Sequence, residues 1–141
     1  MYQHKYFNLR LHDNVELEQI LQAKIVERRT LHEWPLSCVE QVITNEGRKW
    51  VYKSQFGPTV ESQFYANARS KLLVAGNTLY DSESGFVNML FEFIEAPHIQ
   101  DLNLSDAEIV AAWNHLSQSI AKIEGKLPYY HDIGERNAGK N

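Results

Sequence analysis

A lysine inside a predicted strand, followed by a glutamate at the start of a predicted helix, constrains this chain most. Residues 48–65 read RKWVYKSQFGPTVESQFY. The aromatic and β-branched residues before Lys53 favour a strand, and the Gly-Pro pair at 57–58 favours a turn. A helix is predicted over 59–73, because Glu61, Tyr65, Ala68 and Leu72 follow one another at spacings of four, three and four. The lysine can therefore meet the glutamate, although an unrelated pair is the alternative.

The next segments predict a β-hairpin. Gly76 is expected as the C-terminal cap of the preceding helix. Residues 77–82 and 86–94 are rich in β-forming residues and are separated by a short Gly-containing turn. Pro97 then ends the ladder, because proline has no backbone N–H to donate.

In order, the predicted elements are a strand, a turn, the strand that carries Lys53, the helix that carries Glu61, and a hairpin that ends in Phe-Glu-Phe-Ile. This order resembles the N-terminal lobe of the aminoglycoside phosphotransferase and choline kinase-like family of small-molecule kinases, over roughly residues 31–123. The resemblance implies that the chain binds ATP, with Mg in the complete enzyme. Lys53 would contact the α- and β-phosphates, Glu61 would orient Lys53, and Val51 would pack on the adenine face.

The end of the hairpin would be the hinge of such a lobe. The resemblance makes Phe91 the gatekeeper beside the adenine. The carbonyl of Glu92 would accept a hydrogen bond from the adenine amino group, and the N–H of Ile94 would donate one to the ring. An ordinary core strand is the alternative interpretation of these residues.

The loop at 33–38, EWPLSC, departs from many kinase-like folds because it contains no glycine. Members of the small-molecule kinase family often lack that glycine run. Ser37 would then supply a hydroxyl or N–H group to the phosphates.

In the resembled family the catalytic carboxylate and the metal ligands belong to a C-terminal lobe. The segment HDIGERN contains Asp132 and Asn137 at the family loop's spacing, but the histidine directly precedes the aspartate and no later aspartate follows. A polar tail is therefore expected there, and the chain ends about where the second lobe would begin. The resemblance implies an ATP-binding lobe that transfers the γ-phosphate to a small-molecule hydroxyl acceptor only when a C-terminal lobe completes it. The alternative is a non-catalytic interaction module that uses the helix face at 109–123.

Composition restricts the partners and the compartment. A chain of 141 residues with 43% hydrophobic residues suits one soluble domain. Its formal net charge of −4 gives no reason to expect nucleic acid as a partner. No secretion signal or membrane-spanning run is present, so no membrane partner is expected. The lone Cys38 fits a reducing, cytoplasmic compartment and is interpreted as a small buried hydrophobe. The six histidines show no metal-ligand spacing, so no metal site is predicted.

The expected fold class is α+β, a protein-kinase-like N-lobe with a five-stranded, mainly antiparallel sheet, a packed glutamate helix, and a helix at each end. Residues 1–30 would form an N-terminal helical segment, 31–97 the sheet and glutamate helix, and 98–141 a capped helix with a polar tail, all in one domain. The N-terminal helix is predicted over 15–29, with Asp13 or Asn14 as its N-cap. The strands are predicted at 31–34, 38–44, 49–55, 77–82 and 86–94.

A second helix should begin at the capping box formed by Ser105 and Glu108. It carries one apolar stripe, which either folds back on the sheet or pairs with a second copy in a homodimer with Trp113 near the two-fold axis. The stripe consists of Ile109, Trp113, Leu116, Ile120 and Ile123.

Overall fold

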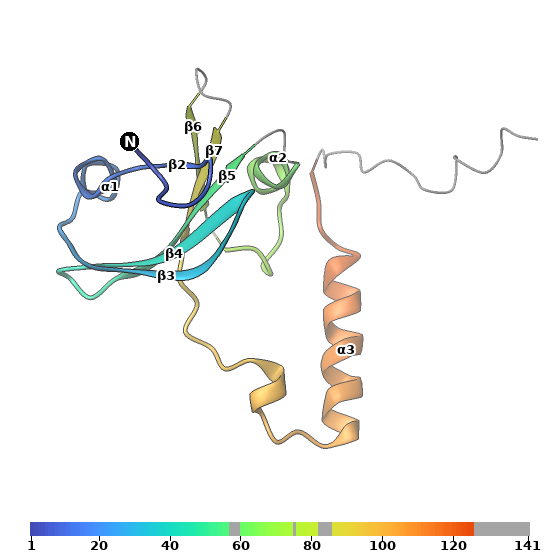
Figure 1. The fold of residues 1–141 in the computed structure, drawn as a ribbon. Coiled ribbons are helices and arrows are strands. Elements are labelled where there is room, and N and C mark those ends of the chain that lie inside the picture. The colour runs from blue at the N-terminus through green and yellow to red at the C-terminus, as the bar shows by residue number, and fades with distance from the viewer. Residues whose placement is uncertain (57–59, 75, 82–85, 126–141) are drawn as a thin grey trace, which may run out of the picture.

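The computed structural model describes residues 1–56, 60–74, 76–81 and 86–125, with the backbone alone described at 76–81. The chain forms an α+β fold in which helices accompany a mainly antiparallel sheet, as predicted (Figure 1). The turn predicted at 57–58 and the hairpin turn at 83–85 lie outside the described residues. Within the described part, no helix combines the length and the apolar character that crossing a membrane requires.

The main sheet has the strand order β3-β4-β5-β7-β6, and every neighbouring pair is antiparallel. A separate small sheet pairs two short strands near the N-terminus. The strands of the main sheet are β3 (Ile25–Trp34), β4 (Ser37–Thr44), β5 (Lys49–Phe56), β6 (Gly76–Asp81) and β7 (Phe86–Glu92), and those of the small sheet are β1 (Tyr2–Gln3) and β2 (Arg10–Leu11).

Tight turns join the first three strands of the main sheet. Trp34 pairs with Ser37, so only two residues connect β3 to β4. Between β4 and β5 the N–H of Gly47 donates to the carbonyl of Thr44 at 2.9 Å. Gly47 has a φ of +77°, a conformation that side chains with a Cβ rarely adopt.

The hydrophobic core lies on one face of the main sheet, beneath the N-terminal segment. Successive side chains of a strand point to opposite faces, so Tyr52 and Ser54 of β5 face this core while Val51 and Lys53 face the other side. The α1 helix (Asn14–Leu21) contributes one fully buried side chain. The buried cluster consists of Leu9, Leu11, Leu17, Cys38, Val42, Tyr52, Phe86 and Leu90.

The predicted helix over 15–29 is too long. The α1 helix ends at Leu21, its C-cap Gln22 adopts the left-handed conformation with a φ of 54°, and β3 begins at Ile25. Residues 25–29 pair with β4 instead, because Ile25 lies opposite Thr44. The start of the helix is as predicted, since the Asp13 side chain and Glu16 form a reciprocal capping box.

The predicted helix over 59–73 is also too long. The α2 helix (Glu61–Asn67) ends before Ala68, whose backbone is extended. Arg69 then forms an antiparallel bridge with Glu124, with N–H···O distances of 2.7 Å and 3.0 Å. Gly76 was expected as a helix cap, but it is the first residue of β6. A pairing with a distant segment therefore overrides the helical spacing after residue 67.

The C-terminal helix stands apart from the sheet (Figure 1). A 3-10 turn, η1 (Ile99–Asp101), precedes α3 (Asp106–Ile120), which starts at the predicted capping box. The stripe does not fold back on the sheet, because Trp113 is 67% exposed. Just past the helix, Gly125 approaches α2 so closely that a Cβ there would lie 2.0 Å from the Asn67 carbonyl oxygen. Only a glycine fits this approach.

Candidate functional site

Lys53 and Glu61 lie together on the face of the sheet opposite the core. The Nζ atom of Lys53 donates to Oε2 of Glu61 at 2.6 Å. Nε2 of Gln55, two residues further along β5, donates to the same oxygen at 2.6 Å. The side chains of Lys53 and Glu61 are 21% and 33% exposed, so the ion pair is accessible to solvent on one side. The structure thus brings together the strand lysine and the helix glutamate that the sequence singled out.

An apolar cavity of about 630 Å³ opens on the same face. This volume falls in the range of small-molecule sites. Four of the residues proposed from the sequence, namely Val51, Phe91, Glu92 and Ile94, line it. The sequence analysis had not assigned the other lining residues, which are Leu31, Tyr65, Val74, Phe93, Glu95, Ala96 and His98.

An aromatic pair forms one wall of this cavity. The rings of Tyr65 and Phe91 have centroids 4.5 Å apart and are tilted by 53°. Tyr65 comes from α2 and Phe91 from β7, where Phe91 lies opposite Val51. Burial, and next the charge of Glu61, raise the pKa of the Tyr65 hydroxyl. The helical spacing from Glu61 to Tyr65 in the sequence was the signal that could have placed Tyr65 here.

The chain leaving β7 presents backbone polar groups. The N–H of Phe93 donates to the carbonyl of Lys49 at 3.0 Å. Because hydrogen-bonded and non-hydrogen-bonded pairs alternate along an antiparallel ladder, the backbone groups of Glu92 point away from β5. Among the described residues, none accepts a hydrogen bond from the N–H of Ile94. The N–H of Ile94 can therefore donate to a ligand, while the backbone groups of Glu92 face the side of β7 on which β6 pairs.

Ser37 lies beside Gln55 at the start of β4 and does not line the cavity. It is 5% exposed, and its Oγ has no hydrogen-bond partner. The Oε1 atom of Gln55 is also buried and unpartnered. Leaving a buried polar atom without a hydrogen bond costs free energy. Ser37 Oγ and Gln55 Oε1 therefore extend the polar site of Lys53 and Glu61 by two oxygens without hydrogen-bond partners among the described residues. Asp132 and Asn137 lie outside the described residues.

A second cluster joins His4, Glu33 and Cys38, whose ligand atoms all lie within 4.8 Å of one another. Its geometry does not suit a metal. Nδ1 of His4 accepts from the backbone N–H groups of Tyr6 and Phe7, each at 3.2 Å. The ring proton is therefore on Nε2, which lies 3.1 Å from Glu33 and donates to it, so neither ring nitrogen keeps a lone pair for an ion.

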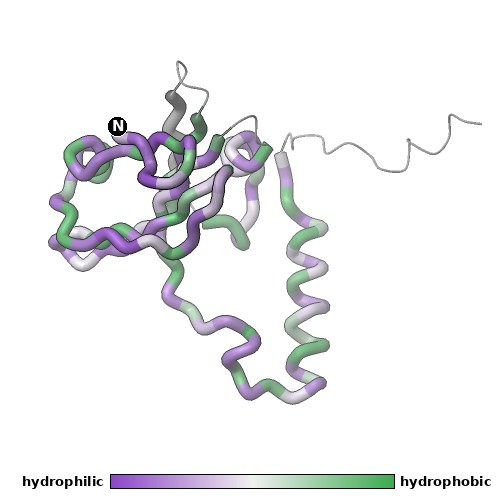
Figure 2. The backbone as a smooth tube through the Cα atoms, in the orientation of Figure 1, coloured by the Kyte–Doolittle hydropathy of each residue, from purple (hydrophilic) through white to green (hydrophobic). Residues whose placement is uncertain are grey.

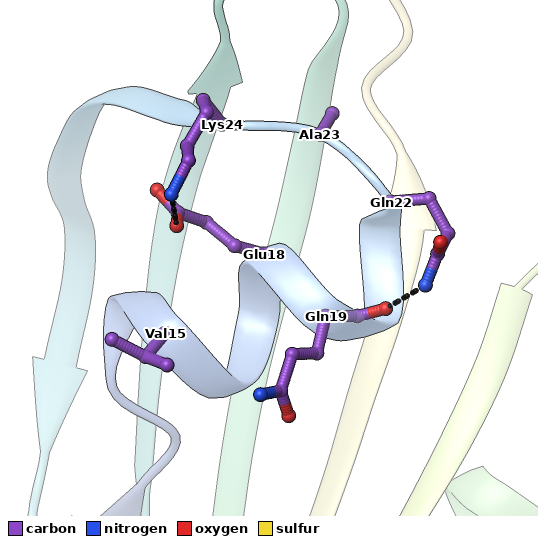
Figure 3. Close-up of a pocket in the computed structure, with 6 residues that line it drawn as sticks. All are labelled: Val15, Glu18, Gln19, Gln22, Ala23 and Lys24. Atoms are coloured by element: carbon purple, nitrogen blue, oxygen red, sulfur yellow. Dashed lines mark hydrogen bonds and ion pairs between the residues drawn. The ribbon is translucent and has the colours of Figure 1, made fainter.

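A further cavity of about 450 Å³ lies at the end of α1 (Figure 3). Its polar groups are already engaged with one another. Lys24 pairs with Glu18 at 2.8 Å, and the side chain of Gln22 donates to the carbonyl of Gln19 at 2.5 Å. Few convergent polar groups are left for a ligand, so the apolar cavity on the Lys53 face of the sheet, which Lys53 itself does not line, is the better candidate.

The thiol of Cys38 should make folding stability sensitive to alkaline pH. Burial, and next the charges of Glu40 and Glu33, raise the pKa of Cys38 from 9.0 to about 11. The unfolded chain therefore loses this proton first, and the free energy of unfolding should fall as pH rises between these two values. Urea titrations from about pH 8 to pH 10 should show a steeper decline for the wild type than for Cys38→Ala. Equal slopes would contradict the prediction.

The chain matches no protein-family model, no curated protein and no solved structure.

Proposed function

We propose that this chain is the nucleotide-binding lobe of an ATP-dependent small-molecule phosphotransferase, with a protein-kinase-like N-lobe fold. One observation carries the proposal. The Lys53–Glu61 ion pair lies on the same sheet face as the apolar cavity, two residues along β5 from the cavity residue Val51. A cation beside an apolar slot suits a ligand that is flat and apolar at one end and anionic at the other.

In this proposal the adenine ring occupies the cavity. Val51 and Leu31 would contact its faces, and the Tyr65–Phe91 wall would limit its depth. The carbonyl of Glu92 would accept from the adenine amino group, and the N–H of Ile94 would donate to the ring. Backbone contacts of this kind recognise the base without requiring particular side chains.

The phosphates would extend along β5 toward the ion pair. The ammonium of Lys53 would contact the α- and β-phosphates, while Glu61 holds that ammonium in place. Ser37 and Gln55, with their buried unpartnered oxygens, would lie at the far end of this path. The bound nucleotide would be ATP with Mg.

Phosphoryl transfer also requires a carboxylate that orients the acceptor hydroxyl and oxygen ligands for the metal. We propose that a C-terminal lobe supplies both, together with the contacts that select the small-molecule acceptor. This chain alone should then bind the nucleotide without turning it over.

Replacement of Lys53 tests the nucleotide proposal. The variant Lys53→Met keeps the length of the side chain and removes the charge, so it should weaken ATP binding at least about tenfold, which corresponds to about 1.4 kcal/mol. Binding would be measured by calorimetry with Mg-ATP and with adenosine. Adenosine has no phosphates, so its affinity should not change.

Lys24→Met is the matched control, because that lysine is 77% exposed and lies outside the proposed site. It should leave ATP binding unchanged. Absence of ATP binding at millimolar concentration, or equal ATP affinity for the wild type and Lys53→Met, would contradict the proposal.

A second candidate function is a non-catalytic interaction module that uses the C-terminal helix. The observation in its favour is the apolar face of α3, which the rest of the described chain leaves exposed. In that case Lys53 and Glu61 would be structural, and the calorimetry above would show no nucleotide binding.

A further inference from the structure

We propose that α3 pairs with α3 of a second copy of this chain, in an antiparallel two-fold contact. The apolar face of α3 is exposed. Four large apolar side chains lie on one side of the helix, and each is at least two-fifths exposed. Their exposed fractions are 46% for Ile109, 67% for Trp113, 41% for Leu116 and 53% for Ile120. A contiguous apolar patch of this kind marks an interaction surface.

The helix also lacks charge after its first turn. Residues 109–121 contain no aspartate, glutamate, lysine or arginine. A helix that faces water normally carries such residues on its outer side, whereas Figure 2 shows hydrophobic positions recurring between uncharged hydrophilic ones along α3. A helix of 15 residues is also marginal without packing. Both features indicate that α3 is covered in the protein's working state.

The spacing along the helix favours a second copy as the occupant. Ile123 lies past the end of α3, and the four stripe positions within the helix, Ile109, Trp113, Leu116 and Ile120, are spaced by four, three and four residues, so their pattern reads the same in both directions. An antiparallel copy centred between Asn114 and His115 therefore places each isoleucine opposite the other isoleucine and each tryptophan opposite a leucine. Such a contact is isologous, as a two-fold dimer requires. The spacing also matches the a and d positions of a coiled-coil seam.

Orientation follows from the ends of the helix. The first turn of α3 is acidic, with Asp106 and Glu108. A parallel pair would place the two acidic turns side by side, and like charges at that distance repel. An antiparallel pair separates them by the length of the helix, about 22 Å at 1.5 Å per residue. The residues that flank the stripe are small, namely Ala112, Ser117 and Ser119, which permits close approach of the two helices.

The rest of the described chain leaves this contact open. The backbone bridge between Arg69 and Glu124 holds the chain just past α3 against the segment after α2, while the four stripe positions within α3 stay exposed. The proposal does not rest on nucleotide binding, because the stripe contains none of the cavity residues.

Sedimentation velocity on the full chain tests the proposal. At about 100 µM the wild type should sediment as a dimer of the 16.4 kDa chain. Leu116→Asp should give a monomer, because it places a carboxylate in the seam. Gln118→Asp lies on the opposite side of the same helix and should remain dimeric. A monomeric wild type, or a dimeric Leu116→Asp variant, would overturn the proposal.

A charge exchange tests the orientation. Ile109→Asp and Ile120→Lys should each dissociate the dimer when introduced alone. The double variant should associate again, because in an antiparallel pair each introduced carboxylate lies opposite an introduced ammonium. In a parallel pair like charges would meet, and the double variant would stay monomeric. Far-UV circular dichroism would show that all variants keep the sheet, to which α3 contributes no buried residue.

Discussion

Replacement of Arg28 by methionine should destabilise the fold by about 3–5 kcal/mol, because it would leave a buried carboxylate without its partner. Nε of Arg28 donates to Oε2 of Glu40 at 2.6 Å. The two side chains are 12% and 9% exposed, so water cannot take over the role of the guanidinium. The variant keeps most of the side-chain volume, and the loss should therefore report the charge and its hydrogen bonds.

The same guanidinium joins the N-terminal segment to the sheet. Its Nη1 atom donates to the carbonyl of His12 at 2.8 Å and lies 3.2 Å from Oδ1 of Asn14. It also lies over the rings of Tyr2 and Tyr52, at 5.7 Å and 5.2 Å from their centroids. Arg28 thus stabilises the arrangement in which residues 1–22 cover the core face of the sheet.

Arg29→Met is the matched control in the same strand. Arg29 is exposed and donates to the side chain of the buried Gln41 at 3.0 Å, so its replacement should cost only that one hydrogen bond, about 1 kcal/mol. Urea unfolding followed by tryptophan fluorescence would measure both variants. Equal losses for the two would show that the Arg28–Glu40 pair does not stabilise the fold.

The features predicted well from the sequence are those set by local chemistry. The N-cap at Asp13 and the capping box at Ser105 start their helices as expected, because the hydrogen bonds of a cap involve residues only three apart. The contact between Lys53 and Glu61 also followed from local order. The two residues are only eight positions apart in the sequence, and the strand, turn and helix between them bring their side chains together.

The features predicted poorly depend on distant partners. Ile25 follows Leu17, Ile20 and Leu21 at spacings that suit a helix, but pairing with β4 places residues 25–29 in the sheet. The helix after Glu61 stops early because Arg69 pairs with Glu124, far along the chain. Leu9 and Leu11 are fully buried, but their alternation with polar residues is too short to predict that a distant sheet face covers them.

The candidate site shows the same division. The lining residues from β5 and β7 were proposed from their strand positions, whereas Leu31, Val74 and His98 come from separate elements that only the tertiary fold brings together. Ser37 was expected near the phosphates from its place in the β3–β4 loop. Its register opposite Gln55 places it beside the polar end of the site and not in the cavity.

Truncation of Leu17 to alanine should cost about 2–5 kcal/mol, because it removes the anchor of α1 from the core. Leu17 is the one buried residue of this helix and is 0% exposed. It packs in the same cluster as Leu9 and Leu11 of the N-terminal segment and Val42 and Tyr52 of the sheet. A cavity at that point would separate the segment from the sheet face that it covers.

Val15→Ala is the control for helix propensity, since Val15 lies in the same helix and is 63% exposed. Alanine favours a helix more than valine does, so this variant should be neutral or slightly stabilising. Chemical denaturation of both variants, with the midpoint and slope fitted separately, would measure the effect. A lower midpoint at the same slope indicates lost stability of the core, whereas a changed slope indicates a change in the denatured state. A cost below about 1 kcal/mol for Leu17→Ala would mean that α1 is not held to the sheet by this side chain. The stability of the core would then come mainly from the buried residues of the sheet.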